Sequence, residues 1–368
     1  MISPFPDEGD TYPHVAYFAK WLKCKASVRW VRIAERGFRV DQLLESTLLA
    51  GDVRLSVRTG TQVRTDWSAV RKAARECDML IAVDFMALVL AHLVSSKPVI
   101  FWSLDFISRD EARYARKINQ LWLALVRRAL LRHKKVIVQD ADRLLALAGS
   151  LGIDSGQLQP FYLPVSLPPV RVNEAFPVKS WSGKPRVMQI GGLNAWRSHT
   201  DFLLEQYRIG HNRFELLLHG IIGSDIAPQI EMLKPKPSLS EGLVACESIP
   251  EVVRQCSAGF LGYRPSDEQF FQIKNASGQL VEFLRCGKPV LSMGANNLVG
   301  FLEREGVGCA VSNSTEFFGA VEKIHADYPR FSQNAHNLYE KYYNFDKYSG
   351  NMLDYLERVA NSHSRSQT

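Results

Sequence analysis

The stretch Asn275-Ala-Ser-Gly-Gln-Leu-Val-Glu-Phe-Leu-Arg-Cys-Gly-Lys-Pro-Val-Leu291 indicates a loop, a short helix, a sharp stop and a buried strand. Ser277 is a favoured N-cap residue. Gly287 and Pro289 mark the end of the helix, because glycine adopts the left-handed cap conformation and proline cannot continue a helix. The apolar residues that follow predict a strand. The stretch is therefore expected to form one helix–strand unit of a layered α/β domain.

The start of this predicted helix has the features of an anion-binding site. Backbone N–H groups in the first turn of a helix have no partner inside it, and Gly278 lets a ligand approach the backbone closely. Glu282, one turn further along, is placed to accept hydrogen bonds from hydroxyl groups beside that anion. A phosphate next to vicinal hydroxyls describes a nucleotide or a nucleotide sugar. The alternative is an ordinary packed turn, in which Glu282 lies in solvent or pairs with Arg285.

Apolar runs alternate with helical patterns in the first part of the chain. Val53–Val57, Met79–Val83 and 98–102 indicate strands, and segments of helical periodicity separate them. Such alternation predicts a parallel, doubly wound sheet, whose ligands bind beyond the carboxyl ends of its strands. A length of 368 residues suggests two domains. The proline-rich stretch 158–185 is expected to contain the linker between them.

The composition argues against several classes of protein. Hydrophobic residues make up 46% of the chain and charged residues 23%, as in ordinary globular domains. The six cysteines form no C-x-x-C pair and no Cys/His cluster with zinc spacing, so neither a disulfide scaffold nor a zinc module is expected. The start of the sequence resembles no signal peptide, and no apolar run has the length of a membrane span. We therefore expect a cytoplasmic protein.

The net charge of +7 favours anionic partners such as nucleotide phosphates or an acidic membrane surface. Much of this charge lies in 108–135, a predicted amphipathic helix with a capping box at Ser108 and Glu111. A basic amphipathic helix with a tryptophan, here Trp122, is typical of peripheral contact with an anionic membrane, but also of a core-facing helix with a solvated basic face. Both interpretations stay open. No RNP, KH, zinc-finger or helix-turn-helix pattern is present, so nucleic acid is not an expected partner.

The opening stretch resembles the donor-site helix of GT-B glycosyltransferases, of the large retaining family known as glycosyl transferases group 1. Members carry the pattern (S/N)-x-K-x-x-E-(Y/F)-x-x-x-G-x-P-V near the start of the last third of the chain. By this resemblance, Ser277, Gly278 and Gln279 face the diphosphate of the donor, and Glu282 holds its ribose. Two positions depart from the pattern: Gln279 replaces a lysine, and Lys274 replaces a second glutamate that many members carry.

A second segment resembles the same family. Arg186-Val-Met-Gln-Ile-Gly-Gly-Leu-Asn-Ala-Trp-Arg-Ser-His199 is similar to the V-G-R-L-x-x-x-K-G turn, although it is not a dinucleotide fingerprint. Gly191 matches the glycine, Gly192 replaces the arginine, and Arg197 replaces the lysine. The resemblance implies that Arg197 stabilises the negative charge that develops on the leaving diphosphate. The alternative for Arg197 is a solvated residue at a helix start.

Three further positions follow from the resemblance. Gly9 matches the glycine of a loop that faces the donor phosphates, and its alternative is a plain surface turn. Asp105, in Trp102-Ser-Leu-Asp-Phe, matches the acidic residue of an acceptor-side turn, and it is expected to bind or deprotonate the acceptor hydroxyl. Its alternative is a helix cap or a loop hydrogen bond. Ser248 lies in a segment that resembles the contact with the nucleotide base.

The resemblance implies an α/β protein of the GT-B fold, with two Rossmann-like, doubly wound domains that face a central cleft. The expected parts are an acceptor-side domain, a linker, a donor domain, a terminal helix that returns to the first domain, and a polar tail: 1–165, 166–185, 186–342, about 343–360 and 361–368. The expected activity is transfer of a sugar from a nucleoside-diphosphate sugar to a sugar or lipid-linked acceptor, in glycan, polysaccharide or glycoconjugate biosynthesis. The family implies retention of the anomeric configuration without a metal ion. The nucleotide sugar is the substrate, and no cofactor is expected.

Two other functions stay open. A sugar-nucleotide epimerase could share the fold, but no convincing acid/base pair can be named in this sequence. A catalytically inactive GT-B-like protein that binds a partner or a membrane fits the departures at Gly192, Lys274 and Gln279, whereas Arg197 and Glu282 argue against it. The sequence does not reveal the base, the sugar, the acceptor, the linkage or the oligomeric state.

Overall fold

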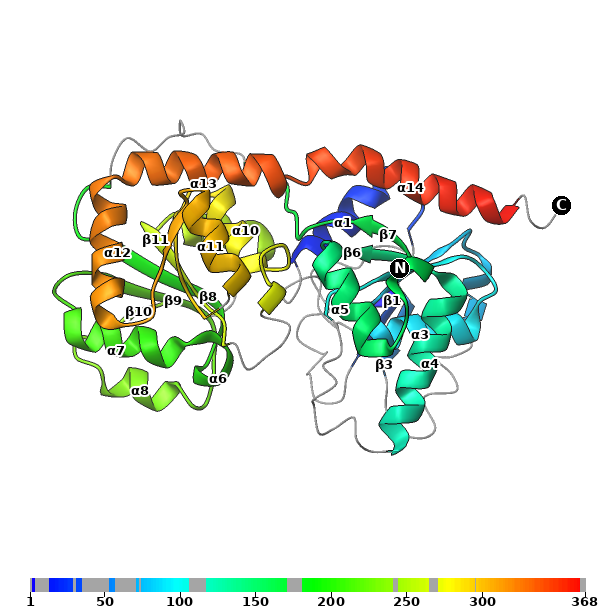
Figure 1. Cartoon of the computed structure of the whole chain (residues 1–368), viewed down its shortest axis with the longest axis horizontal. Coiled ribbons are helices and arrows are strands. Elements are labelled where there is room, and N and C mark those ends of the chain that lie inside the picture. Colours follow the sequence, from blue (N-terminus) through cyan, green and yellow to red (C-terminus); the bar gives the residue numbers. More distant parts are fainter. Residues whose placement is uncertain are drawn as a thin grey trace. The chain divides into compact units, whose positions relative to one another are not determined.

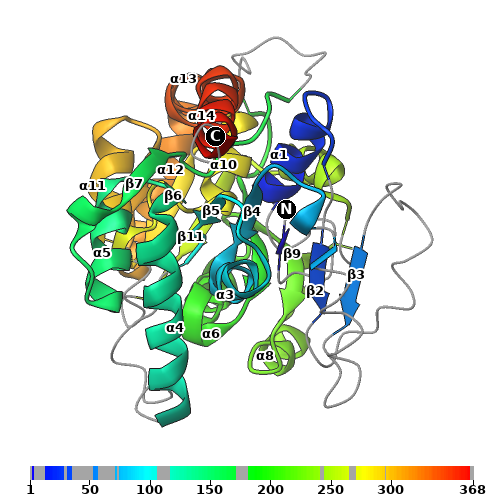
Figure 2. The ribbon, with the colours of Figure 1, turned by 90° about the vertical axis from the view of Figure 1, so that its right-hand side faces the viewer.

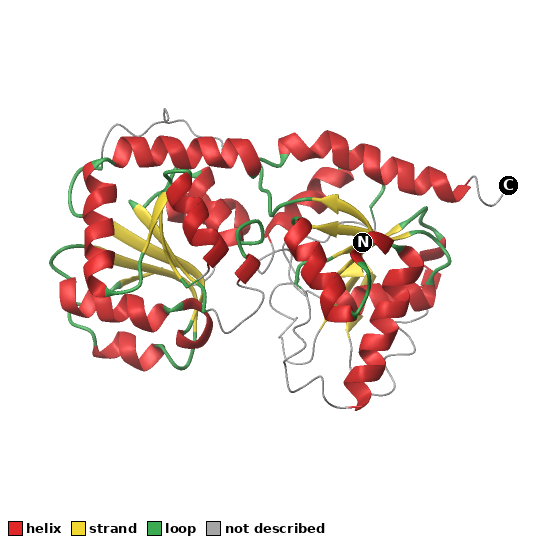
Figure 3. Cartoon of the chain, in the orientation of Figure 1, coloured by secondary structure: helices red, strands yellow, loops and turns green. Residues whose placement is uncertain are grey.

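The computed structural model divides into two compact units, Met1–Pro164 together with Asp346–Thr368, and Val165–Phe345 (Figures 1 and 3). The residues that the structure describes are 2–3, 13–28, 31–34, 53–56, 71–72, 74–105, 117–170, 181–240, 244–264, 271–294 and 296–364. Gly9 lies outside the described residues, and so does the predicted capping box at Ser108 and Glu111. No described helix is both long enough and apolar enough to cross a bilayer.

The first unit is built on a parallel sheet of seven described strands, in the order β3-β2-β1-β4-β5-β6-β7. Every described pairing in it is parallel. The strands are β1 (Ile2–Ser3), β2 (Val31–Ala34), β3 (Val53–Ser56), β4 (Leu80–Val83), β5 (Val99–Trp102), β6 (Lys135–Val138) and β7 (Gln159–Tyr162). The prediction of a parallel, doubly wound sheet is therefore confirmed for this part of the chain.

Helices cover both faces of this sheet. The described helices of the unit are α1 (Pro13–Lys23), α3 (Asp84–Val94), α4 (Lys117–His133), α5 (Ala141–Leu151) and α14 (Asp346–Ser364). α3, α4 and α5 bury their apolar stripes against the face that carries Phe101. The next residue, Trp102, points to the opposite face, where its ring centroid lies 4.9 Å from that of Phe18 in α1. On α14, the ring centroid of Tyr355 lies 5.0 Å from that of Phe161 in β7.

β7 lies at the start of the proline-rich stretch 158–185, which is expected to contain the linker. Gln159–Tyr162 pairs in parallel with β6, with Pro160 opposite Val136. Proline cannot donate a hydrogen bond to a ladder, so it is tolerated in a sheet where one side of the strand has no neighbour. β7 is the last strand in the described order and meets that condition. The proline-rich composition therefore marks an edge strand before it marks a linker.

The second unit carries a separate parallel sheet with the described order β10-β9-β8-β11-β12-β13. Its strands are β8 (Arg186–Leu193), β9 (Glu215–Ile222), β10 (Ser238–Leu239), β11 (Ala258–Gly262), β12 (Val290–Met293) and β13 (Gly308–Ala310). Its helices are α6 (Ala195–Ser198), α7 (Thr200–Gly210), α8 (Ala227–Met232), α9 (Ile249–Val253), α10 (Gly278–Arg285), α11 (Asn296–Arg304), α12 (Ser314–Ala326) and α13 (Tyr328–Tyr342).

The two faces of this sheet have different partners. α7, α8 and α12 share a core with Phe260 of β11, to which Leu204, Ile230 and Phe317 contribute. The opposite face of the sheet is covered by α10, whose Phe283 ring packs directly on Gly259 of β11. The N-terminus of α10 consequently lies at the edge of the sheet where the parallel strands β8 and β11 end, the edge at which ligands of doubly wound sheets bind.

Three helical segments differ from the sequence-based expectation. The sequence after the glycine turn at Gly191 predicts one helix that runs through Tyr207. The structure divides it into α6 and α7, because His199 between them adopts a left-handed backbone with φ of 50°. α13 was not predicted, although Pro329 in its first turn and Phe331, Ala335 and Leu338 on its buried face fit a helix. α14 extends to Ser364, so the first four residues of the expected polar tail are helical.

β8 and β9 approach each other unusually closely at their carboxyl ends. Gly191 and Gly220 stand opposite each other, with φ of +95° and +136°. A Cβ atom on Gly220 would lie 2.0 Å from the carbonyl oxygen of Gly191. Only glycine adopts such a backbone without strain and leaves room for that oxygen.

We predict that Gly220→Ala destabilises the protein by about 2 kcal/mol or more, because it combines the unfavourable φ with a backbone clash. The matched control is Gly319→Ala in α12, where a Cβ would meet nothing within 4 Å. This control is expected to stabilise by about 0.5–1 kcal/mol, since alanine is the better helix former. Thermal unfolding of both variants measures the contrast, and similar melting temperatures would contradict it.

Candidate functional site

The helix α10 begins and ends as its sequence predicts. The Ser277 Oγ accepts a hydrogen bond from the backbone N–H of Leu280 at 3.0 Å, which makes Ser277 the N-cap. At the other end, Gly287 has a φ of 63° and its N–H donates to the carbonyl of Leu284. Both predicted caps are thus confirmed, because local capping chemistry needs only neighbouring residues.

The first turn of α10 presents two backbone donors. The N–H groups of Leu280 and Val281 are satisfied by the side chain and the carbonyl of Ser277. The N–H groups of Gly278 and Gln279 have no partner among the described residues. The helix dipole adds a partial positive charge at the same end. This arrangement can receive the oxygen atoms of an anion, phosphate included.

Gln279 connects this helix start to the end of β8. Its Nε2 donates to the carbonyl oxygen of Ile190 at 2.7 Å. A Cβ atom on the neighbouring Gly191 would lie only 2.6 Å from the same Nε2. The hydroxyl of Tyr263, at the end of β11, hydrogen-bonds Ser277 Oγ and lies 3.4 Å from Gln279 Oε1. The two segments that resemble a donor site are therefore in direct contact in the structure.

The same bonds decide which groups are available to a ligand. The side chains of Ser277 and Gln279 are both engaged inside the protein. The backbone N–H groups of Gly278 and Gln279 are the donors of this turn that have no partner among the described residues. Sequence reasoning missed Tyr263, whose single signal is its position directly after a buried strand. Burial raises the pKa of its phenol above the ordinary value, so it stays a neutral hydroxyl.

Glu282 is a buried carboxylate paired with Arg285. Its side chain is 4% exposed, and its Oε2 lies 2.7 Å from Arg285 Nε. Burial raises the pKa of Glu282 to about 7, although the Arg285 guanidinium opposes this shift. The other oxygen, Oε1, is buried without a hydrogen-bond partner among the described residues. The pairing with Arg285 is the alternative foreseen from the sequence. The contact of Glu282 with a ribose stays a prediction.

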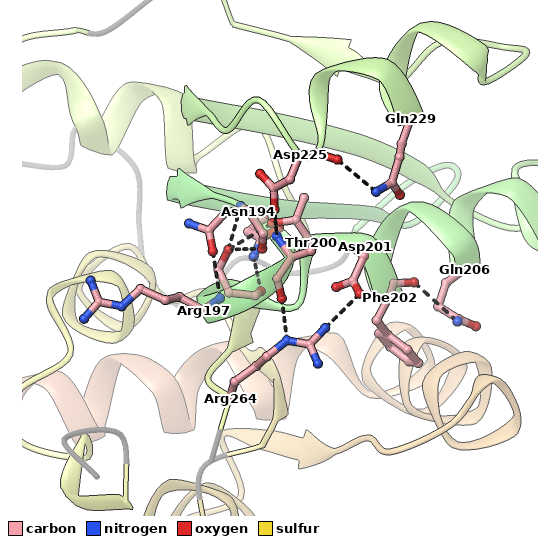
Figure 4. A network of polar contacts seen from close by, with 12 residues as sticks. Asn194, Arg197, Thr200, Asp201, Phe202, Gln206, Asp225, Gln229 and Arg264 are labelled. Atoms are coloured by element: carbon pink, nitrogen blue, oxygen red, sulfur yellow. Dashed lines mark hydrogen bonds and ion pairs between the residues drawn. The ribbon is translucent and has the colours of Figure 1, made fainter. Parts of the chain in front are cut away.

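Arg197 lies on α6, immediately beyond β8. The N-cap of this short helix is Asn194, whose Oδ1 accepts the N–H of Arg197 at 2.8 Å. The Arg197 side chain is exposed, and its guanidinium carbon lies 4.9 Å from the ring centroid of Trp196, which is itself 63% exposed. In Figure 4 the Arg197 side chain extends away from the polar network around it. α6 thus presents a cation at the same sheet edge as the start of α10.

Asp105 lies in the first unit, after β5, in a braced turn. The buried Arg143 donates through Nη2 to the carbonyl of Leu104 at 2.6 Å, and the same atom lies 3.7 Å from Asp105 Oδ1. Gln139 accepts from Arg143 Nε and donates to the carbonyl of Ser103. The Asp105 side chain is 49% exposed. Its role at the acceptor stays a prediction, and the bracing by Arg143 could not be read from the sequence.

Ser248 ends a short 3-10 turn (Cys246–Ser248) just before α9 and is half-buried. Its contact with a base stays a prediction. Asp140 and Asp142, which stand in an Asp-x-Asp spacing, lie at the start of α5, where Asp140 Oδ1 caps the helix by accepting the N–H of Arg143 at 2.8 Å. In the part of the chain that the structure describes, no three His, Cys, Asp or Glu side chains gather as metal ligands would.

Comparison with known proteins gives similarity in structure only. No protein-family model and no curated protein sequence matches the chain. HepE of Anabaena in complex with UDP-glucose is similar with a TM-score of 0.71 at 15% identity, over 97% of this chain and 99% of HepE. Sucrose-phosphate synthase of Thermosynechococcus elongatus is similar with a TM-score of 0.69 at 13% identity, over 98% and 99% of the two chains. WaaG, a glycosyltransferase involved in lipopolysaccharide biosynthesis, gives 0.64 at 12% identity, over 92% and 94%.

These structural neighbours are GT-B glycosyltransferases. At such identities the likeness establishes the fold, and the GT-B fold expected from the sequence is confirmed. The fold leaves the activity to be argued from the side chains of this chain.

The Glu282–Arg285 pair makes stability sensitive to pH. We predict that Arg285→Met costs about 3 kcal/mol at about pH 8, because an ionised carboxylate is left buried alone. The loss should shrink at about pH 5.5. The folded-state pKa of Glu282 lies above its ordinary value of 4.5, so the folded protein binds a proton as the pH falls and the buried charge disappears.

Urea unfolding at the two pH values measures this effect. Glu282→Gln combined with Arg285→Met is the control, which should show little pH dependence because neither charge remains. An equal loss for Arg285→Met at both pH values would show that Glu282 is not the group that titrates.

Proposed function

We propose that this protein transfers a sugar from a nucleoside-diphosphate sugar to an acceptor hydroxyl. The observation that carries the proposal is the contact between Gln279 and the Ile190 carbonyl. It joins the start of α10, with its two available N–H groups, to the glycine turn at Gly191 and to the segment that carries Arg197. The GT-B fold adds support, since the similar HepE structure holds UDP-glucose.

In the proposed complex, the backbone N–H groups of Gly278 and Gln279 hold the diphosphate. Arg197 places a full positive charge beside it, where negative charge grows as the bond to the sugar breaks. The Oε1 atom of Glu282 accepts a hydrogen bond from the ribose. Since this atom is buried, the contact requires a small rearrangement of neighbouring side chains.

On the basis of the resemblance to GT-B glycosyltransferases, we propose that the transfer retains the anomeric configuration. We also propose that it proceeds without a metal ion, because Arg197 and the α10 dipole supply positive charge at the diphosphate. Asp105 is proposed to orient the acceptor hydroxyl, with Arg143 holding its turn. The proposed acceptor is a sugar or a lipid-linked acceptor. The products enter glycan, polysaccharide or glycoconjugate synthesis.

We predict that a nucleoside diphosphate binds the protein and that Arg197→Ala weakens this binding about 10- to 100-fold, which corresponds to the loss of one charge-assisted contact. Isothermal titration calorimetry with UDP, GDP, ADP, CDP and dTDP measures the five affinities and identifies the preferred base. UDP is tested first. Glu282→Gln should weaken the selected nucleotide less, because a ribose hydroxyl can also hydrogen-bond an amide.

Arg330→Ala, an exposed arginine of the same unit on α13, is the matched control and should leave binding unchanged. If no nucleoside diphosphate binds at millimolar concentration, the glycosyltransferase proposal fails and an inactive GT-B-like protein is favoured. If binding survives Arg197→Ala and Glu282→Gln without change, the nucleotide occupies another site.

We also propose that α4 makes a peripheral contact with an anionic membrane surface. Val126, Ala129 and Leu130 of this helix are buried in the core of the first unit. Leu121 is 64% exposed, and Arg127, Arg128 and Arg132 are exposed as well. Figures 1 and 2 show the first turns of α4 extending beyond the strands of its unit. An exposed apolar residue beside several arginines fits an anionic lipid surface.

Vesicle co-sedimentation tests this contact. The protein is expected to bind vesicles that contain phosphatidylglycerol more strongly than pure phosphatidylcholine vesicles. Arg128→Gln with Arg132→Gln should reduce binding roughly tenfold or more, at about 1 kcal/mol for each basic residue. The control Arg208→Gln with Arg330→Gln removes the same charge from the second unit. An equal loss in the control would indicate a response to net charge alone.

A further inference from the structure

The helix that carries Arg197 is too short to be stable alone. α6 spans four residues, Ala195–Ser198. A helix of one turn contains almost no internal hydrogen bonds, and nucleation of such a turn is unfavourable. An arginine on a mobile turn would approach a diphosphate in many orientations. Its usefulness therefore depends on what holds α6 in place.

Two acidic or amide side chains hold the N–H groups of α6. Asp225, which follows β9, accepts the N–H of Ala195 through Oδ2 at 2.8 Å. Asn194 accepts the N–H of Arg197 at 2.8 Å. These contacts satisfy donors that the short helix cannot satisfy itself.

Gln189 and Arg264 donate hydrogen bonds to the carbonyl groups of α6. Gln189 of β8 donates through Nε2 to the carbonyl of Ser198 at 2.7 Å. Arg264, two residues beyond β11, makes two contacts with the helix. Its Nε donates to the carbonyl of Ala195, and its backbone N–H donates to the carbonyl of Arg197 at 3.1 Å.

The guanidinium of Arg264 is itself fixed by Asp201. Its Nη2 lies 2.8 Å from Asp201 Oδ2 in the first turn of α7. The side chains of the two residues are about one-third exposed, 35% and 34%. Figure 4 shows the Arg264 guanidinium between α6 and Asp201, with the Arg197 side chain directed elsewhere. Arg264 thus ties three segments together: the end of β11, α6 and the start of α7.

We propose that Arg264 is a positioning residue, which holds α6 so that Arg197 meets the distal phosphate of the donor. This inference rests on the function proposed above. Arg264 does not touch the donor in this scheme, and it acts through the orientation of Arg197. Asp201 contributes by fixing the planar guanidinium, whose fork geometry allows one side chain to serve a carbonyl and a carboxylate together.

A comparison within the unit separates this role from an ordinary surface ion pair. Arg208 pairs with Glu205 on the same helix, α7, and both side chains are well exposed. That pair joins a helix to itself, and exposed pairs of this kind contribute little to stability. Arg264 instead joins a catalytic segment to two other elements. Its loss should therefore change ligand recognition more than global stability.

The test compares the affinities for UDP and UMP, measured by calorimetry on the full chain. If the panel above selects another base, the diphosphate and monophosphate of that base replace them. Arg264→Gln should weaken UDP binding roughly fivefold or more and change UMP binding less than about twofold, since coupled groups commonly show effects of this size. Arg264→Lys should restore the affinity for UDP only in part, because an ammonium group cannot reproduce the fork.

Two comparisons decide the outcome. Arg208→Gln removes an exposed arginine–carboxylate pair within α7 and should leave the UDP-to-UMP ratio unchanged. In the Arg197→Ala background, Arg264→Gln should have almost no further effect on UDP binding, because its influence passes through Arg197. Full additivity of the two substitutions, or equal weakening of UDP and UMP, would overturn the proposal.

Hydrogen exchange supplies a readout that does not depend on a ligand. Arg264→Gln should accelerate amide exchange at Ala195 and Arg197, with little change in α10. Unchanged exchange in α6 would show that Arg264 does not hold it and would overturn the proposal even if UDP binds. If the wild-type protein binds no nucleoside diphosphate while Arg264→Gln still accelerates amide exchange in α6, the proposed function alone is refuted.

Discussion

The hydrogen bond between Gln279 and the carbonyl of Ile190 joins the start of α10 to the end of β8. Parallel strands bring their carboxyl ends to one edge of a sheet, but they do not fix the distance between a helix and a neighbouring turn. The bond fixes it here, and it is possible because Gly191 leaves room for the amide. A lysine at position 279 that bonded the Ile190 carbonyl could not also contact an anion. The amide of Gln279 therefore makes a structural contact in place of a ligand contact.

Two arginines of the second unit illustrate how burial decides the meaning of a charge. Arg285 is buried and compensates Glu282, so its removal acts mainly on stability. Arg264 is partly exposed and links α6 to the start of α7, and we propose that its removal acts mainly on geometry. Arg285 lies three positions from Glu282 in the chain, whereas Arg264 lies 63 positions from Asp201. No sequence pattern distinguishes the two roles.

Local chemistry explains which features were predictable. The caps of α10, the buried strands and the alternation of helices and strands depend on nearest neighbours and on period, and they were predicted from the sequence. β7 was not predicted as a strand, because its proline gives the composition of a linker, and α13 was not predicted either. The helix is divided at His199, which adopts a left-handed backbone although it is not a glycine, so the sequence gives no sign of the break. Tertiary packing selected that conformation over the helix that local propensity favoured.

The sequence by itself determined the α/β class, the resemblance to GT-B glycosyltransferases and the residues around Gly191, Arg197 and Ser277–Glu282, because caps, turns and periodicity are encoded locally. Only the tertiary structure decided how these residues act. It turned Gln279 inward, paired Glu282 with Arg285, and recruited Tyr263 and Arg264 from the end of β11. Such contacts join residues far apart in the chain, and their geometry arises when the sheet brings strand ends together.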